Sequence, residues 1–261
     1  MSHPEELNHE TAHVNNLWEE SRNSSVVKAL KNGISLQEII DKQEIKKPLE
    51  KPERMVCSDG RCLHNGETFC MAGSGILLDG EEFKQLIKDH GNIKCLTSHD
   101  GCGAAKIAFE SYKEKKLLPE NITTADEFAK WWTKSKAEEY GLDYQHISAS
   151  EFNDSNHHEA GLMVDSTGMF NSELVDGLPN VFVSQSANCT KDSYVRDEIN
   201  ILTSIAFSDH GFGQRITKED PFYIFICAKN QTDKIRLTNI AQEAISSYGD
   251  KVVIEAFVSP Y

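Results

Sequence analysis

The fold is decided by residues 222–258, which read FYIFICAKNQTDKIRLTNIAQEAISSYGDKVVIEAFV. Residues 222–228 and 252–258 are short apolar runs of strand length, rich in β-branched and aromatic side chains. Between them, residues 235–248 have the pattern of a helix that stops at Gly249. A strand, a helix and a second strand in succession are typical of a parallel β-α-β unit.

The same alternation extends back along the chain to Arg54. Further strands are expected at 55–57, 68–71, 93–96, 161–165 and 181–183, and further helices at 82–90, 104–116, 125–140 and 195–206. The predicted fold class is therefore α/β, with a mainly parallel central sheet and helices on both faces. Internal repetition is not expected: residues 98–103 (SHDGCG) and 208–213 (SDHGFG) are similar, but the second lacks the cysteine, and we interpret the similarity as coincidence.

The first fifty residues are polar and helix-prone, and Ser35 with Glu38 predicts a capping box at the start of a short helix. This segment has too little apolar surface to fold alone, so we expect it to lie across the main body or across a neighbouring subunit. We predict a helical arm at residues 1–53, joined through a proline-containing connection to an α/β domain at 54–261.

The composition limits the classes of partner and compartment. Hydrophobic residues make up 39% and charged residues 26% of the chain, the balance of a soluble globular protein. No apolar run approaches the ~18 residues of a membrane helix, and residues 1–20 lack the apolar centre of a signal peptide. The formal charge of −14 repels phosphate backbones and anionic lipids. We therefore expect a cytoplasmic protein with a small-molecule substrate, and neither nucleic acid nor membrane as a partner.

The seven cysteines are an odd number and form no Cys-x-x-Cys pair. Without a signal peptide a disulfide framework is not expected, so the thiols are interpreted as reduced. Reduced thiols in such a chain either fill the core or bind a metal ion.

Two short segments contain residues that can bind a metal ion or take part in catalysis. They are CSDGR at 57–61 and HDGCG at 99–103. Each follows a predicted strand, and functional groups in parallel sheets gather at the carboxyl ends of strands. If the two strands are neighbours, Cys57, His99 and Cys102 converge. Two thiolates and one imidazole form a zinc site with an open fourth position, which is the catalytic arrangement. Gly101 and Gly103 allow the tight turn that brings the later ligands to the ion.

Asp59 and Arg61 distinguish this pattern from a structural zinc site, which has no use for a carboxylate and a guanidinium beside its ligand. In an extended segment, residues 57, 59 and 61 point the same way. Arg61 can then hold Asp59 ionised with paired hydrogen bonds, and Asp59 can accept a hydrogen bond from a zinc-bound hydroxide.

The pattern Cys-x-Asp-x-Arg followed by His-x-x-Cys-Gly resembles the β-class carbonic anhydrases over residues 54–104. A weaker similarity covers residues 160–170, where Asp165-Ser-Thr-Gly168 is similar to a later Asp-x-x-Thr-Gly of that family. Residues 175–261 show no similarity to the family and are interpreted as an extension of it. Met71 stands where the family usually has asparagine.

The resemblance implies one Zn²⁺ per chain bound by Cys57, His99 and Cys102, with Asp59 and Arg61 as the catalytic pair. It implies reversible hydration of CO2 to bicarbonate and a proton, through zinc-bound hydroxide. Because two thiolates cancel the charge of the metal, we expect activity to be favoured above neutral pH. The family builds its site at a subunit boundary, which predicts a homodimer or a larger even assembly.

Other interpretations remain open at this point. Cys62 can complete a structural zinc site with the same three ligands, in which case Cys62 is required for metal binding. A zinc hydrolase acting on a CO2 analogue such as CS2 or COS, or a catalytically silent relative that binds zinc, would also have these residues.

Overall fold

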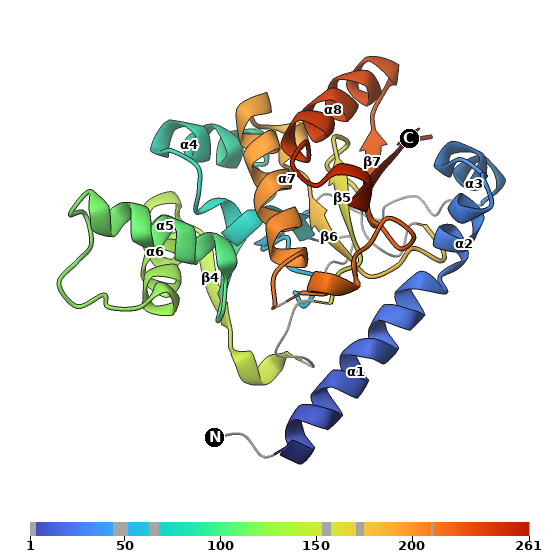
Figure 1. Cartoon of the computed structure of the whole chain (residues 1–261). Coiled ribbons are helices and arrows are strands. Elements are labelled where there is room, and N and C mark those ends of the chain that lie inside the picture. The colour runs from blue at the N-terminus through green and yellow to red at the C-terminus, as the bar shows by residue number, and fades with distance from the viewer. Residues whose placement is uncertain are drawn as a thin grey trace.

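The computed structural model describes residues 4–43, 52–62, 68–152, 158–170, 175–209 and 211–260, with side chains from residue 13 onward. Within these ranges the chain has the predicted α/β class, and it contains two four-stranded sheets rather than one (Figure 1). All strand pairs in both sheets are parallel. The division of the chain at residue 53 stays a prediction.

The first sheet has the strand order β2-β1-β3-β4. Its strands are β1 (Arg54–Val56), β2 (Thr68–Cys70), β3 (Cys95–His99) and β4 (Asp143–Ile147), and its helices are α4 (Gly80–Asp89), α5 (Gly103–Glu114) and α6 (Ala125–Tyr140). The sequence analysis did not predict β4, because Asp143, Gln145 and His146 give it a polar appearance. It lies at the edge of the sheet, where none of its residues is fully buried and polar side chains are tolerated.

The second sheet has the order β6-β5-β7-β8. Its strands are β5 (Gly161–Asp165), β6 (Val181–Ser184), β7 (Phe222–Ala228) and β8 (Val252–Val258), and its helices are α7 (Asp192–Ala206) and α8 (Gln231–Ala244). The segment that we interpreted as an extension therefore provides most of this sheet.

The two sheets repeat the same topology, so the expectation of no internal repetition was wrong. In each sheet the first strand in the chain pairs with the second on one side and the third on the other, and the fourth lies beyond the third. The first strands also match in sequence: Met-Val-Cys-Ser-Asp-Gly at residues 55–60 corresponds to Met-Val-Asp-Ser-Thr-Gly at 163–168. The similarity that we dismissed is indeed unrelated to this repeat, because residues 208–213 precede β7 rather than follow it.

Alternating side chains of the second sheet belong to two different cores, as the two-residue period of a strand requires. In β5, Leu162 and Val164 pack with α7 and α8, whereas Met163 packs into the core of the first sheet. Every residue of β5, β6 and β7 is buried, so this sheet is covered on both faces.

The amino-terminal helices lie against the main body, which was one of the two expected placements. They are α1 (Pro4–Arg22), α2 (Ser25–Lys31) and α3 (Leu36–Lys42). The capping box of Ser35 and Glu38 at the start of α3 is confirmed. Trp18 packs in the core beneath α7, and Leu36 and Ile40 reach the other core, where α3 contacts β8.

The two sheets contact each other at the carboxyl ends of β1 and β2. The backbone N–H of Val183 in β6 donates to the carbonyl of Ser58 at 3.1 Å, and that of Gln185 donates to the carbonyl of Cys70 at 2.8 Å. The second sheet is therefore attached to the carboxyl ends of β1 and β2, beside Cys57.

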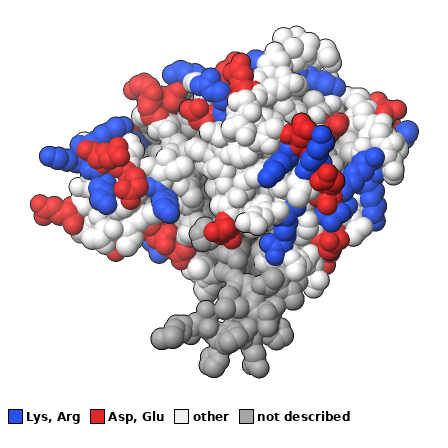
Figure 2. All heavy atoms as spheres, viewed as in Figure 1, with Lys and Arg blue, Asp and Glu red and all other residues white. Residues whose placement is uncertain are grey.

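The surface of the described ranges gives no sign of a membrane-spanning segment, since none of their helices combines the necessary length and apolarity. On the face seen in Figure 2, basic and acidic side chains are interspersed.

Candidate metal centre

The structure brings Cys57, His99 and Cys102 together. Cys57 directly follows β1, His99 is the last residue of β3, and Cys102 precedes the first turn of α5. Because β1 and β3 are adjacent parallel strands, their carboxyl ends lie at the same edge of the sheet. The three ligand atoms lie within 4.8 Å of one another, and all three residues are buried. This geometry forms a cluster that can bind a metal ion.

The donor atoms suit a tetrahedral ion. The sulfurs of Cys57 and Cys102 are 4.0 Å apart, and two thiolates at ~2.3 Å from a tetrahedral zinc ion are about 3.8 Å apart. The Nδ1 of His99 lies 2.9 Å from the backbone oxygen of Asp100. An N–H at Nδ1 that donates to this carbonyl leaves the lone pair on Nε2. Nε2 is buried and has no hydrogen-bond partner in the described ranges, as expected of a metal-facing nitrogen.

The ligands hold protons that a metal ion must displace. The hydrogen bond with Cys102, burial and the neighbouring thiol together raise the pKa of Cys57 well above its ordinary value. Burial alone lowers the pKa of His99, but attraction from Cys57 and Asp59 outweighs it and raises that pKa to about 9. Metal binding at this cluster therefore releases protons and strengthens as the pH rises.

Glycines allow the loops around the cluster to approach it. Gly101 has a φ of +71°, which permits the predicted turn between His99 and Cys102. Gly73 has a φ of +55°, and its N–H donates to the sulfur of Cys57 at 3.2 Å. A Cβ at Gly73 would lie 2.6 Å from a methyl carbon of Ile76 and 3.0 Å from Ala104. A side chain there would force the ligand loops apart.

Asp59 and Arg61 form the predicted pair. Arg61 donates from Nη2 to Oδ2 of Asp59 at 2.7 Å and from Nε to Oδ1 at 3.0 Å. Burial disfavours the guanidinium charge, but the hydrogen bonds and attraction from Asp59 raise the pKa of Arg61 overall. Oδ2 of Asp59 lies 3.8 Å from Nε2 of His99, so the carboxylate faces the metal-ligand cluster. The ring of Phe152 lies under the guanidinium, with its centroid 4.6 Å from the central carbon.

A second carboxylate fixes the loop that carries His99. Asp100 accepts hydrogen bonds from the ring Nε2 of His146 at 3.0 Å and from the backbone N–H of Ala149 at 3.0 Å, and Lys130 lies 3.1 Å away. The ring Nδ1 of His146 in turn lies 2.9 Å from the hydroxyl of Ser98. The sequence analysis missed this network because β4, which contributes His146, was not predicted.

The second sheet and α7 supply the apolar wall of the site. A hollow of about 10 Å³, enough for roughly one water molecule, is lined by Cys57, Asp59 and His99 from the first sheet. Facing them are Phe182 of β6 and Ile201, Leu202 and Ile205 of α7. The sequence analysis assigned none of these four to the site, because no motif identifies them and they are a hundred residues away in the chain.

Glu198 of α7 also reaches the ligand loops and was not predicted. Its carboxylate accepts hydrogen bonds from the hydroxyls of Ser58 at 3.1 Å and Ser184 at 2.7 Å, and from the N–H of Ala72. Glu198 is 1% exposed. The available signal was its position on the apolar stripe of α7, next to Ile199, where a carboxylate needs hydrogen-bond donors.

Comparison with known proteins does not identify the family. No family model, no curated protein and no solved structure matches this chain. The resemblance to β-class carbonic anhydrases therefore rests on the sequence motifs alone.

The alternative of four protein ligands is not formed by the described residues. The cluster found there comprises Cys57, His99 and Cys102 alone, although Cys62 is buried nearby. The backbone N–H of Cys62 donates to the carbonyl of Asp59 at 2.9 Å, and burial raises the pKa of its thiol well above the ordinary value. Cys62 thus behaves as a buried apolar residue that closes the turn after Asp59.

Proposed function

We propose that this chain is a zinc-dependent carbonic anhydrase that interconverts CO2 and bicarbonate. The observation that carries the proposal is the combination of three buried ligands with an ion-paired carboxylate facing them. Cys57, His99 and Cys102 would hold one zinc ion and leave its fourth position to solvent. A zinc ion bound there acts as a Lewis acid and lowers the pKa of a bound water toward neutrality.

Asp59 orients the attacking solvent molecule. Its Oδ1 accepts the backbone N–H of Arg61 at 2.9 Å and Nε of the guanidinium at 3.0 Å, and its Oδ2, which accepts Nη2 of Arg61 at 2.7 Å, also lies 3.8 Å from Nε2 of His99. An oxygen nucleophile that donates a hydrogen bond to Oδ2 keeps its proton there and directs a lone pair away from Asp59, toward the carbon of CO2. Arg61 keeps Asp59 ionised and fixed, so that no reorganisation is needed during the reaction.

The apolar wall favours a small uncharged substrate. Phe182, Ile201 and Leu202 offer no hydrogen bond to a charged group, and the hollow admits only a molecule of a few atoms. CO2 is such a molecule, whereas bicarbonate is charged and is released more readily from an apolar site.

The origin of the apolar wall bears on the expected assembly. The resemblance implies a site whose wall is completed by a partner subunit, but in this chain residues of the second sheet and α7 line the hollow. The homodimer stays a prediction, and light scattering of the active protein measures it.

The test is stopped-flow CO2 hydration on protein of known metal content. We expect one zinc per chain, a zinc-dependent rate that rises above neutral pH, and loss of both zinc and rate in Cys102→Ser. Cys95→Ser is the matched control, because Cys95 begins β3 and lies outside the cluster. This variant should retain the metal and the rate.

Three results would contradict the proposal. A protein with one zinc that releases sulfide from CS2 but does not hydrate CO2 would be a hydrolase of the analogue. A zinc-bound protein inactive on both substrates would be a silent relative. Loss of zinc in Cys62→Ser would indicate a structural site with four protein ligands.

A further inference from the structure

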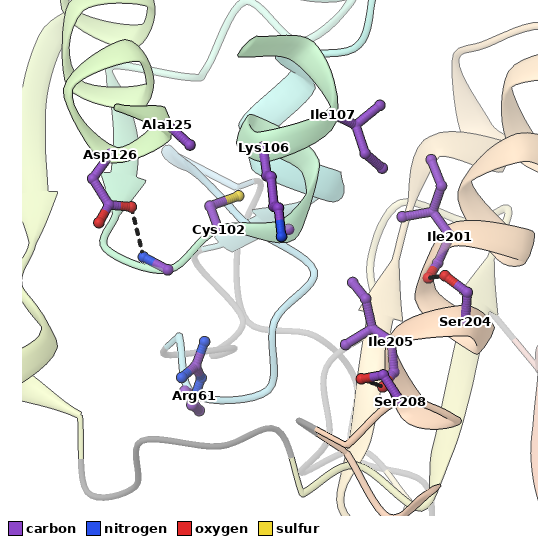
Figure 3. Close-up of a pocket in the computed structure, with 12 residues that line it drawn as sticks. Arg61, Cys102, Lys106, Ile107, Ala125, Asp126, Ile201, Ser204, Ile205 and Ser208 are labelled. Carbon is purple, nitrogen blue, oxygen red and sulfur yellow. Dashed lines mark hydrogen bonds between the residues drawn. The ribbon is translucent and has the colours of Figure 1, made fainter. Parts of the chain in front are cut away.

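A second and much larger hollow lies beside the metal centre. It has a volume of about 510 Å³, within the range of small-molecule pockets. It opens between the first turns of α5 and the carboxyl-terminal half of α7, as Figure 3 shows. It shares Gly103, Ile201 and Ile205 with the small hollow. Cys102 and Arg61 of the metal centre also line it, whereas Cys57, Asp59 and His99 do not. The hydration of CO2 does not require a space of this size.

Two cationic side chains line the larger hollow. Lys106 and Arg61 extend into it from opposite sides (Figure 3). Arg61 is ion-paired with Asp59. Lys106 forms no ion pair within the described ranges, in contrast to Lys113 on the same helix, which lies 3.8 Å from Glu110.

The one acidic side chain among the described lining residues is Asp126, and its charge is compensated. Its Oδ1 accepts the N–H of Gly101 at 2.8 Å. It also lies in the first turn of α6, where the helix dipole stabilises a negative charge. Lys106 is thus the uncompensated charge on the described wall, and it attracts an anion.

The wall of the hollow is also aliphatic. Ile107, Ile201 and Ile205 line it, with Ile107 projecting from α5 toward the two isoleucines of α7 (Figure 3). Ile107 is 45% exposed, so it leaves apolar surface that a ligand can cover. A cation and branched aliphatic side chains around one hollow match a molecule with an anionic head and a hydrocarbon body.

We propose that this hollow binds a small aliphatic monocarboxylate, with its carboxylate at Lys106 and its hydrocarbon chain between Ile107 and the isoleucines of α7. The proposal goes beyond the reaction proposed above, because Cys57, Asp59 and His99 do not line this hollow, although Cys102 and Arg61 border it. Hexanoate is a short member of this class and serves as the probe.

The test is calorimetric titration of the zinc-loaded full chain with hexanoate. Acetate has the same charge without the chain, and hexan-1-ol has the chain without the charge. We expect hexanoate to bind more tightly than either. We expect Lys106→Gln to weaken hexanoate binding by about 5-fold or more, the loss of one charge-assisted contact. Ile107→Ser should also weaken hexanoate binding, whereas Lys113→Gln should leave it unchanged. Circular dichroism of each variant verifies the fold.

Several outcomes would overturn the proposal. Equal binding of acetate and hexanoate, or no effect of Lys106→Gln, would remove the evidence for this orientation. Loss of hexanoate binding when zinc alone is removed would show that the carboxylate binds the metal. A concentration-dependent dimer that excludes hexanoate, detected by light scattering, would assign the hollow to a second copy of the chain.

Discussion

The two sheets of this protein have the same strand order, yet among the residues that the structure describes only the first carries a cluster that can bind a metal ion. At the end of β1 the chain reads Cys57-Ser-Asp-Gly60, and at the corresponding end of β5 it reads Asp165-Ser-Thr-Gly168. The loops at the corresponding edges of the two sheets therefore differ. The loop after β1 presents a donor atom to the metal-ligand cluster, whereas the loop after β5 is held by hydrogen bonds within itself.

In the second sheet the corresponding positions have structural roles. Asp165, which corresponds to Cys57, is fully buried and accepts hydrogen bonds from the N–H groups of Thr167, Met169 and Phe170. Asn230 occupies the capping position of α8, as Cys102 does in α5, and its side chain accepts the N–H of Asp233 at 2.9 Å. A carboxylate saturated by backbone donors and a capping amide have little capacity left for a metal ion.

The difference shows that the topology provides the position and a few side chains provide the chemistry. The second sheet still serves the site, because β6 and α7 supply the apolar wall and Glu198. The two repeats have complementary roles: one holds the ligands and the other encloses them.

The largest expected effect comes from Asp59. Asp59→Asn keeps the shape but removes the charged acceptor, so we expect CO2 hydration to fall at least about 100-fold with zinc still bound. The equivalent change in the second sheet, Thr167→Val, should leave the rate unchanged. Stopped-flow rates and zinc content of both variants make the comparison. An unaltered rate in Asp59→Asn would mean that the carboxylate does not orient the nucleophile.

Removal of zinc should affect the two repeats unequally. A metal ion present at 100 times its Kd stabilises the folded state by about 2.7 kcal/mol, so chelation should lower the free energy of unfolding by at least about this amount. We expect hydrogen exchange to accelerate at residues 57–60 and 99–104 and to stay slow at 165–170. Equal acceleration in both segments would contradict a metal site confined to the first repeat.

Glu198 should link the pH dependence of stability to the contact between the repeats. Burial raises its pKa above 4.5, despite the hydrogen bonds from neighbouring serines. Its contribution to stability is therefore fully present below about pH 4.5 and is lost as the pH rises through the raised pKa. The glutamine in Glu198→Gln cannot titrate. The free energy of unfolding of this variant should therefore increase relative to that of the wild type as the pH rises, by up to about 1.4 kcal/mol per pH unit in this window.

Urea titrations of the wild type and Glu198→Gln between pH 4 and 8 measure this difference. Glu127→Gln is a control, since Glu127 lies at the exposed start of α6 and its pKa is lowered by hydrogen bonds to Thr123 and Thr124. A constant difference between Glu198→Gln and the wild type at all pH values would refute the linkage.

The smallest effect is expected for the two serines at equivalent positions. Ser58 donates to Glu198, whereas the hydroxyl of Ser166 donates to Asp233 at 3.3 Å and accepts the N–H of Lys229 at 3.0 Å. Replacing either by alanine should cost about 1 kcal/mol of stability. Only Ser58→Ala should also weaken zinc binding, since it alone adjoins a ligand. Urea unfolding together with competition for zinc against a chelator separates the two effects.

Local patterns were sufficient to predict most of the elements. The capping box at Ser35, the helix at 125–140 and the strands β5 to β8 all agree with the sequence analysis. The edge strand β4 escaped prediction because its burial is only partial and its side chains are mostly polar. The number of sheets was also not predicted, because the alternation of strands and helices does not indicate which strands pair.

The amino-acid sequence by itself determined the α/β class, the approximate positions of every described strand except β4 and the spacing of the five motif residues. These depend on side-chain period, on capping and on turns, all of which act within a few residues of the chain. The tertiary structure alone decided that the chain contains two equivalent sheets, that Glu198 reaches Ser58, and that Phe182 and Ile201 enclose the cluster. Such contacts join segments that are far apart in the chain, and they arise from packing rather than from any local pattern.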